Sequence, residues 1–359
     1  MADDAKAHAA PAPRIAVLVD REGLGDALLK MPFLRAIAHA YPGRKVWWIA
    51  TYQTSMAQEL SPFVGTLIAR TIENAGLGGQ LLQVVRRLRE FPEFELVFDM
   101  RSRVATVLLA RCFLKHRVFV CCLPAYLLSQ RRPPRRWLRP DSIAARALSM
   151  AEAAAGQPAV WQGSFAVSGS ARALAQQRLP DGPTYVGIAA GSRETRKNWP
   201  MDRYIALAQR LSESGRVPVL LIGPQEREIL AELRRVLPQA LFPEAMPADP
   251  TLGLGRLELA MAICERLSAA VANDSGIGHL LGALQVPLIS LFGPTDAKRW
   301  RPFTACGTII DAKQFGGTAM DLIPVDTVFK AIETMIVPGP PPAGPAAGSS
   351  PARRPDAKI

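Results

Sequence analysis

The stretch RIAVLVDREGLGDALLKMP (Arg14–Pro32) contains the pattern on which the fold depends. Its first part, Arg14–Asp20, is a short apolar run rich in β-branched residues, which is typical of a buried strand. A loop with two glycines follows, and apolar residues then recur at helical spacing, at Leu28, Met31, Leu34, Ile37 and Ala38. The order of strand, glycine loop and helix predicts the first unit of a parallel α/β sheet.

The same alternation continues through two halves of the chain. In the first half we expect strands at 45–50, 96–100 and 117–121, a helix at 104–113 and another that ends at Ala155. In the second half, strands at 184–191, 217–223, 269–274 and 286–293 alternate with helices at 202–211, 226–236, 256–266 and 278–284, and 325–336 closes the series. This pattern predicts two Rossmann-like, doubly wound domains whose strand carboxyl ends face a shared cleft.

The composition suggests where these domains begin and end. We expect a flexible leader at 1–13, an N-terminal domain at 14–155, a connection at 156–183 and a C-terminal domain at 184–337. Residues 338–359 are mostly Pro, Ala, Gly and Ser with a few charged residues, which cannot build a core, so we predict a disordered tail.

The chain is basic, with 43 Lys and Arg against 31 Asp and Glu and a net charge of +12 over 359 residues. This balance favours an anionic partner, which could be nucleic acid, a phospholipid surface or a phosphorylated substrate. A generally arginine-rich composition is the simpler explanation and remains open.

The five cysteines form neither a disulfide framework nor a zinc motif, because their number is odd and no C-x-x-C occurs. The N-terminal residues MADDAKAHAAPAP lack the apolar core of a secretory signal, and no run of about 18 apolar residues could span a membrane. These features predict a cytoplasmic protein.

Four motifs fall at predicted strand ends, where ligands bind in open α/β sheets. In REGLGDALLKMP, Gly23 and Gly25 permit tight turns and Asp26 stands at the start of the helix. Asp26 could be only a helix N-cap or could do chemistry. The loop is not G-x-G-x-x-G, which argues against a nicotinamide site.

The second motif, AAGSRETRKNWP, gathers a hydroxyl and three cations in one loop, at Ser192, Arg193, Arg196 and Lys197. The loop is suited to bind a phosphate, although a surface loop with incidental charges would look the same. The fourth motif, LFGPTDAKRWRPF, indicates only a loop beside the cleft.

The third motif, VANDSGIGHLLGA, runs from a strand into a helix through Asp274, Ser275 and Gly276. Backbone N–H groups and the positive end of a helix dipole make such a turn a ready anion site. His279 falls in the first turn of the helix and could be either structural or part of the site.

The segment QRRPPRRWLRP (130–140) interrupts the alternation. Its prolines exclude a regular helix, and its arginines, with Trp137 among them, predict an exposed basic loop: Arg131, Arg132, Arg135, Arg136 and Arg139. There are three interpretations of this loop: solvated surface charge, a nucleic-acid site, and a site for an anionic glycolipid at a membrane. The presence of only one aromatic side chain argues against nucleic acid.

Taken together, these motifs resemble glycosyltransferase family nine, the lipopolysaccharide heptosyltransferases. The similarity extends over about residues 14–336. It rests most specifically on GSRETRKNWP and on NDSGIGHLLGALQVPLISLFGPTDAKRW, and also on GLGDALLKMPFLRAIAHAYPGRKVWWIA, FELVFDMRSRVATVLLAR and LLIGPQEREI. The chain departs from the family pattern at Arg101-Ser102, where Gln-Gly is frequent, and at Arg193, where some members have a second hydroxyl.

The resemblance implies a GT-B fold, in which the C-terminal domain binds the nucleotide sugar. It makes Asp26 the general base, assigns the donor diphosphate to Lys197 and Ser192, and assigns the ribose hydroxyls to Glu226. The remaining donor-side residues are Arg193, Asp274, Ser275, Gly276 and His279. On the acceptor side we expect Gly25, Arg101, Arg103, Arg131, Arg132, Arg135 and Arg136.

The resemblance therefore predicts an inverting glycosyltransferase that moves heptose from ADP-heptose onto a lipopolysaccharide core or related glycan. We expect no cofactor and no metal, since no D-x-D pair occurs and cations would stabilise the leaving diphosphate. We also expect peripheral contact with the inner face of an anionic membrane and no nucleic-acid partner. The alternatives are a nucleotide-sugar epimerase or hydrolase of the same fold and a non-catalytic nucleotide-sugar binding module.

Overall fold

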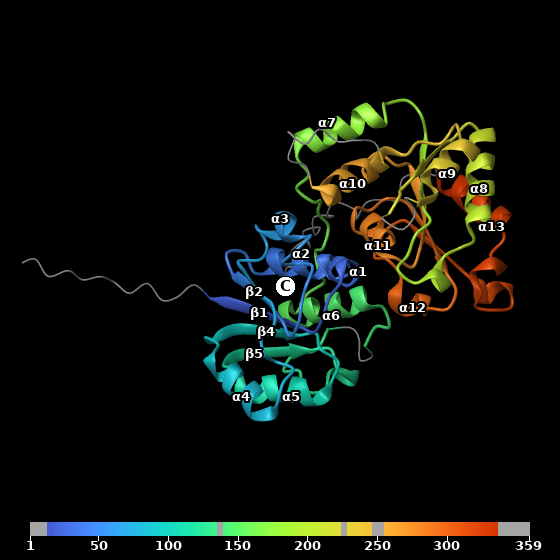
Figure 1. The fold of residues 1–359 in the computed structure, drawn as a ribbon. Helices are drawn as coiled ribbons and strands as arrows, with labels where there is room; N and C mark the ends of the chain where they lie inside the picture. The colour runs from blue at the N-terminus through green and yellow to red at the C-terminus, as the bar shows by residue number, and fades with distance from the viewer. Residues whose placement is uncertain (1–12, 135–138, 224–227, 246–254, 337–359) are drawn as a thin grey trace, which may run out of the picture.

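A computed structural model describes residues 13–134, 139–223, 228–245 and 255–336. It contains two five-stranded parallel sheets, one in each half of the chain, with helices packed on both faces of each (Figure 1). The predicted pair of Rossmann-like domains is therefore confirmed. The predictions for the leader, except residue 13, and for the tail at 338–359 lie outside the described residues.

The N-terminal sheet has the order β3-β2-β1-β4-β5, with β1 (Arg14–Val19) at its centre. Its other strands are β2 (Lys45–Ala50), β3 (Arg70–Ile72), β4 (Phe94–Asp99) and β5 (His116–Cys121). Side chains alternate along β1, so that Ala16 and Leu18 pack beneath α4 (Leu81–Glu90) and α5 (Val104–Phe113). The opposite face packs against α1 (Leu24–Leu28), α2 (Met31–Ala40) and α6 (Ile143–Ala155).

The C-terminal sheet has the order β10-β9-β8-β6-β7. Its strands are β6 (Tyr185–Ala189), β7 (Val217–Leu220), β8 (Ala269–Asn273), β9 (Leu288–Phe292) and β10 (Gly307–Asp311). One face packs against α7 (Gly169–Arg178), α10 (Arg256–Cys264) and α11 (Gly276–Ala283). The other packs against α8 (Met201–Glu213), α9 (Leu230–Val236) and α13 (Val325–Ile336), while α3 (Ser61–Val64) and α12 (Ala297–Trp300) are short.

Both sheets reverse their strand order next to the first strand of the domain. In the N-terminal sheet the reversal falls between β1 and β4, and in the C-terminal sheet between β6 and β8. Such reversals open a crevice beyond the strand carboxyl ends, because the connections on either side leave in opposite directions. The loops that follow β1, β6 and β8 carry three of the motifs singled out in the sequence.

Two predicted elements differ from the structure. The helix expected from Leu28 onward is two helices, α1 and α2, since Pro32, in the first turn of α2, has no N–H to donate to the Leu28 carbonyl. The connection at 156–183 is not all irregular, because α7 forms within it and packs on α10. We missed α7 because it buries little more than Ala171, Ala175 and part of Arg178.

The inner faces of the two domains belong to one hydrophobic cluster, which continues through the connecting segment at Phe165 and Val167. The guanidinium of Arg35, on α2, lies 4.9 Å from the centre of the Phe165 ring, and Phe63 meets the same ring edge to face. The connection is therefore anchored to the N-terminal domain. In the described part of the chain, no helix combines the length and apolarity needed to cross a membrane.

Candidate active site

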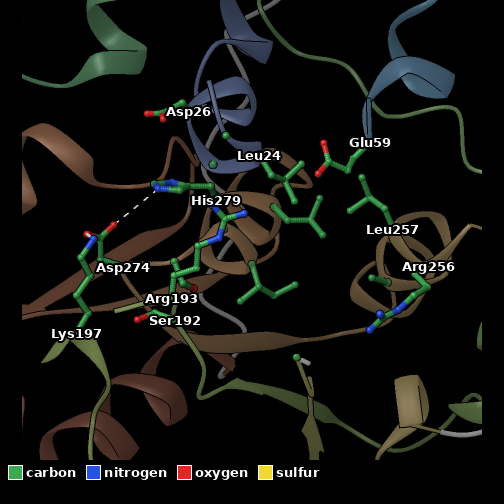
Figure 2. A pocket seen from close by; sticks show the side chains of 18 of the residues that line it. Leu24, Asp26, Glu59, Ser192, Arg193, Lys197, Arg256, Leu257, Asp274 and His279 are labelled. Atoms are coloured by element: carbon green, nitrogen blue, oxygen red, sulfur yellow. Dashed lines mark hydrogen bonds and ion pairs between the residues drawn. The ribbon is translucent and has the colours of Figure 1, made fainter. Parts of the chain in front are cut away.

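A cavity of about 810 Å³ lies between the domains, where α1 meets α11. Its N-terminal wall is the loop after β1 together with Glu59, and its C-terminal wall is formed by the loops after β6, β7 and β8 and by the start of α10. Figure 2 shows Asp26, His279, Asp274 and Lys197 gathered on one side of this cavity, with Glu59, Leu257 and Arg256 on the other. The structure thus brings together residues predicted for the base and for the donor site.

Asp26 is not a helix cap. The N-cap of α1 is Gly23, and Asp26 lies in the first turn without a side-chain capping bond. Its carboxylate lines the cavity and makes no hydrogen bond or ion pair with the described residues. The N-cap interpretation is therefore wrong, and a carboxylate without a protein partner is free to accept a proton from a ligand.

The loop that carries Asp26 is stabilised by Glu22, a residue that the sequence analysis did not single out. The buried Glu22 carboxylate accepts hydrogen bonds from Trp48 Nε1 (2.8 Å) and Thr54 Oγ1 (2.8 Å) and forms an ion pair with Lys30. Lys30 also donates to the Asp26 carbonyl at 3.3 Å. Because breaking a buried pair leaves an uncompensated charge, this network fixes where α1 begins.

Gly25 is the point of closest approach between the domains. A Cβ at this position would lie 2.7 Å from His279 Cδ2 and 3.7 Å from the Cα of Gly276. Only a residue without a side chain permits this contact between α1 and α11. We predicted Gly25 as an acceptor contact; the structure shows it lining the cavity and packed against the donor-side helix.

On the donor side, Asn273 at the end of β8 ties two loops together. Its side chain accepts hydrogen bonds from the Trp199 N–H (3.2 Å) and the Tyr204 hydroxyl (2.7 Å) and donates to the Ala190 carbonyl (2.6 Å). Trp199 is buried and its indole N–H reaches the Ile323 carbonyl. The loop between β6 and α8 is therefore fixed against the start of α11.

Lys197 projects from this loop into the cavity, where its ammonium contacts two carboxylates. Nζ lies 3.2 Å from Asp274 Oδ2 and 3.0 Å from Glu194 Oε1. Burial alone would lower the pKa of Lys197, but the hydrogen bonds to Glu194 and Asp274 outweigh it and raise the pKa. The ammonium is charged, and its charge is already compensated by the protein.

The other members of the loop differ in what they contact. The Ser192 hydroxyl is nearly buried and donates to the Glu194 carbonyl at 2.8 Å. Arg196 pairs with Glu194 and does not line the cavity. Arg193 lines the cavity, and its guanidinium has no hydrogen bond or ion pair with any described residue (Figure 2).

His279 lies on the first turn of α11, buried against Gly25. Its Nε2 is 3.8 Å from Asp274 Oδ1, and its Nδ1 has no hydrogen-bond partner among the described residues. Burial lowers the pKa of His279 despite the nearby Asp274 and Asp26, so the imidazole is neutral at neutral pH. Ser275 caps the same helix by accepting from the Gly278 N–H at 3.4 Å.

Several predicted acceptor residues lie away from this cavity. Arg101 is buried and pairs with Asp99 through both carboxylate oxygens, at 2.9 and 2.6 Å, so its guanidinium is not available to a ligand. The prediction that Arg101 binds the acceptor does not fit the structure, because Asp99, two residues earlier in the chain, already neutralises its charge. Arg103 and Arg132 are exposed, and Arg131 is exposed yet donates to the Ala154 carbonyl. Glu226, Arg135 and Arg136 lie outside the described residues.

The apolar part of the cavity lining was not foreseen from the sequence. Apolar side chains line the cavity together with three further charged ones: Leu24, Ile222, Leu257, Leu259, Ala260, Ile277 and Leu280, with Glu59, Glu244 and Arg256. An apolar compartment beside a charged one suits a ligand with a flat hydrophobic part and an anionic part. Nowhere in the described ranges do three or more His, Cys, Asp or Glu side chains gather as a metal site would require.

Two Rossmann-like domains with a free carboxylate on one wall and a helix N-terminus beside cations on the other form the arrangement of a GT-B glycosyltransferase. The chain belongs to glycosyltransferase family 9 (heptosyltransferase), whose family model matches residues 83–319. It is therefore a glycosyltransferase of the heptosyltransferase family, as the sequence motifs predicted.

Individual relatives agree with this assignment. The chain is 26% identical to lipopolysaccharide heptosyltransferase 1 of Pseudomonas aeruginosa, with 78% of this chain and 79% of the relative aligned. It is 24% identical to lipopolysaccharide heptosyltransferase 3 of Escherichia coli K12, over 78% and 83%. A match of 32% identity to lipooligosaccharide heptosyltransferase 2 of Haemophilus influenzae spans only 32% of either chain.

Solved structures show the same fold. A family 9 glycosyltransferase from Veillonella parvula superposes with a TM-score of 0.65 at 19% identity, covering 90% of this chain and 97% of its own. The E. coli heptosyltransferase WaaC with ADP gives a TM-score of 0.61 at 19% identity, covering 89% and 99%.

The contact at Gly25 leads to a first prediction. Gly25→Ala should lower turnover by roughly 10²-fold while the melting temperature stays close to the parent's, because the added methyl group displaces His279 or separates α1 from α11 by a fraction of an ångström. Steady-state kinetics and thermal unfolding measure both. Gly23→Ala is the matched control, since a Cβ there meets nothing within 4 Å. Parent-like turnover in Gly25→Ala would rule out a tight contact during catalysis.

Proposed function

We propose that the protein is an inverting heptosyltransferase that transfers heptose from ADP-heptose to a hydroxyl of a lipopolysaccharide core or related glycan. The observation that carries the proposal is the Asp26 carboxylate, which has no partner among the described residues and faces the donor-side loops across one cavity. Relatives named lipopolysaccharide heptosyltransferases and a structural neighbour with ADP-2-deoxy-2-fluoro heptose bound support the donor and the acceptor class.

In this mechanism Asp26 accepts the proton of the acceptor hydroxyl as its oxygen attacks the anomeric carbon. The bond between that carbon and the diphosphate oxygen breaks on the opposite face, the configuration inverts, and the nucleoside diphosphate leaves as an anion. General-base assistance contributes roughly 10²–10⁴ in rate. Neutral His279 and Asp274 lie beside the reaction path, where they contact the sugar rather than the leaving group.

The donor diphosphate binds between the loop after β6 and the start of α11. The backbone N–H groups at Ser275 and Gly276 supply the positive end of the helix dipole. Lys197 contributes a cation that Asp274 and Glu194 partly neutralise, so Arg193 supplies the uncompensated charge. The nucleobase occupies the apolar end near Leu257, and Glu226 binds the ribose.

We further propose that the reaction needs neither metal nor cofactor and that the protein works on the cytoplasmic side of a membrane, as a peripheral protein without a nucleic-acid partner. The absence of a D-x-D pair and the positions of Arg193, Lys197 and the α11 N-terminus support metal independence. The excess of basic residues supports an anionic glycolipid as acceptor.

The central test is Asp26→Asn. The variant should bind ADP within a few-fold of the parent and should lose roughly 10²–10⁴ in kcat, since the amide cannot take the proton. Glu59→Gln is the matched control, because it neutralises another carboxylate of the same cavity wall. Retention of more than half the activity in Asp26→Asn would remove Asp26 from the chemistry.

A second test separates the charges of the donor loop. Arg193→Ala should raise the Kd for ADP by about 10- to 100-fold, the scale of one charge-assisted hydrogen bond, and should affect AMP much less. Calorimetry with both nucleotides measures the difference. Arg196→Ala, three residues further along the loop and already paired with Glu194, should bind ADP like the parent. Equal losses for ADP and AMP would move Arg193 away from the second phosphate.

The metal requirement is tested by chelation. Turnover measured after dialysis against excess EDTA should match that of untreated protein, because protein cations and the helix N-terminus balance the leaving charge. A loss of turnover that Mg²⁺ or Mn²⁺ restores would contradict this expectation.

A further inference from the structure

The carboxyl edge of the N-terminal sheet carries an unusual set of exposed apolar side chains. Eight large hydrophobic residues are exposed in the described parts of the chain, and six of them lie in loops or first helical turns that follow strands of this one sheet. They are Tyr52 after β2, Leu81 and Leu82 at the start of α4, Val104 and Leu108 on the first turns of α5, and Leu127 after β5. We call this set the apolar rim.

The exposure of the apolar rim is large enough to carry a free-energy cost in water. Leu82 is 83% exposed, Leu81 60% and Leu127 54%. The helices α4 and α5 pack side by side on one face of the sheet, so their first turns lie at the same edge (Figure 1). Grouped apolar residues of this kind mark an interaction surface rather than scattered surface leucines.

Most of the apolar rim lies in segments without acidic residues. The segments 78–89, 101–108 and 122–134 contain no Asp or Glu, and Arg103 and Arg132 are among their exposed cations. Neither of these two side chains has an ion-pair partner among the described residues. The rim therefore combines apolar side chains with uncompensated positive charge.

The opposite edge of the same sheet is built differently. There Arg44 pairs with Glu95, Arg117 with Glu93, and Arg86 and Arg87 with Glu90, while Lys45, Arg70 and Lys115 are exposed without an ion-pair partner among the described residues. Acidic side chains therefore accompany the cations at that edge, whereas the segments that carry the leucines of the apolar rim contain none.

We propose that the apolar rim docks on an anionic lipid surface, with its leucines inserted between headgroups and Arg103 and Arg132 against lipid phosphates. Apolar insertion and electrostatic attraction are the two contributions that hold a peripheral protein at a bilayer. Since the rim lies at the same edge of the sheet as the loop after β1 that lines the cavity, docking presents the cavity to a lipid-anchored acceptor. The inference rests on the proposed function for the acceptor, but the docking itself is independent of turnover.

The test is flotation of the full-length protein with vesicles of phosphatidylcholine, with and without 30% phosphatidylglycerol, at low and high salt. The parent should float with anionic vesicles and should keep part of its binding at high salt. Leu82→Ser/Leu108→Ser/Leu127→Ser should abolish the salt-resistant part. Arg103→Ser/Arg132→Ser should lower the partition coefficient at low salt by roughly 30-fold, at about 1 kcal/mol per cation.

Two controls match these changes elsewhere on the molecule. Val160→Ser/Leu322→Ser removes exposed apolar residues outside the rim, and Arg44→Ser/Arg117→Ser removes two cations from the opposite edge. Both should float like the parent. Turnover on a water-soluble acceptor fragment should be unchanged in the leucine variant, and absence of that activity in the parent would reject the proposed function without affecting the docking result.

Two outcomes would overturn the proposal. One is parent-like flotation of both rim variants. The other is a concentration-dependent dimer of the parent in sedimentation that the leucine variant abolishes, because the rim would then be covered by a second copy of the chain.

Discussion

The side-chain amide of Asn273 is the interaction on which the donor side of the cleft depends. It stands at the carboxyl end of β8 and binds the loop after β6 at both ends, through the Ala190 carbonyl and the Trp199 N–H. These bonds fix Lys197 at hydrogen-bonding distance from Asp274, which is the next residue after Asn273. An amide suits this position because it donates and accepts at once, whereas a carboxylate would leave the Ala190 carbonyl without a donor.

Charge compensation then determines which residues can respond to a ligand. Of the described residues that line the cavity, five carry carboxylates and three carry permanent cations. With His279 neutral, an anionic diphosphate therefore meets a wall that is not strongly positive overall. The position of single cations therefore matters more than the net charge, because Lys197 is paired with two carboxylates while Arg193 has no ion-pair partner among the described residues. A ligand phosphate can recruit Arg193 without breaking an existing ion pair.

The sequence predicted eight of the ten strands and the loops that follow them, since apolar alternation and glycine turns are local signals. It missed β3 and β10, two edge strands that are short and largely not buried. It could not predict which charges remain free. Arg101 looked available beside a strand end, but Asp99 binds it two residues away, and the partner of Lys197 lies 77 positions along the chain. The N-cap question at Asp26 depended on whether α1 begins at Leu24 or later, which periodicity does not resolve. Whether the predicted donor and acceptor residues bind their ligands remains a prediction.

The topology also explains why the candidate general base and the apolar rim lie at the same edge of one sheet. In a parallel sheet all strands end on the same side, so the loop after β1 that carries Asp26 and the loops that carry the apolar rim share one edge of the N-terminal domain. An acceptor dissolved in water would need no apolar residues there, and exposing Leu81 and Leu82 would only reduce solubility. An acceptor anchored in a bilayer can be reached only if this edge can lie against the membrane surface. The same constraint favours exposed arginines without an ion-pair partner at this edge, as Arg103 and Arg132 are among the described residues, because an ion-paired arginine has less charge to offer a lipid phosphate.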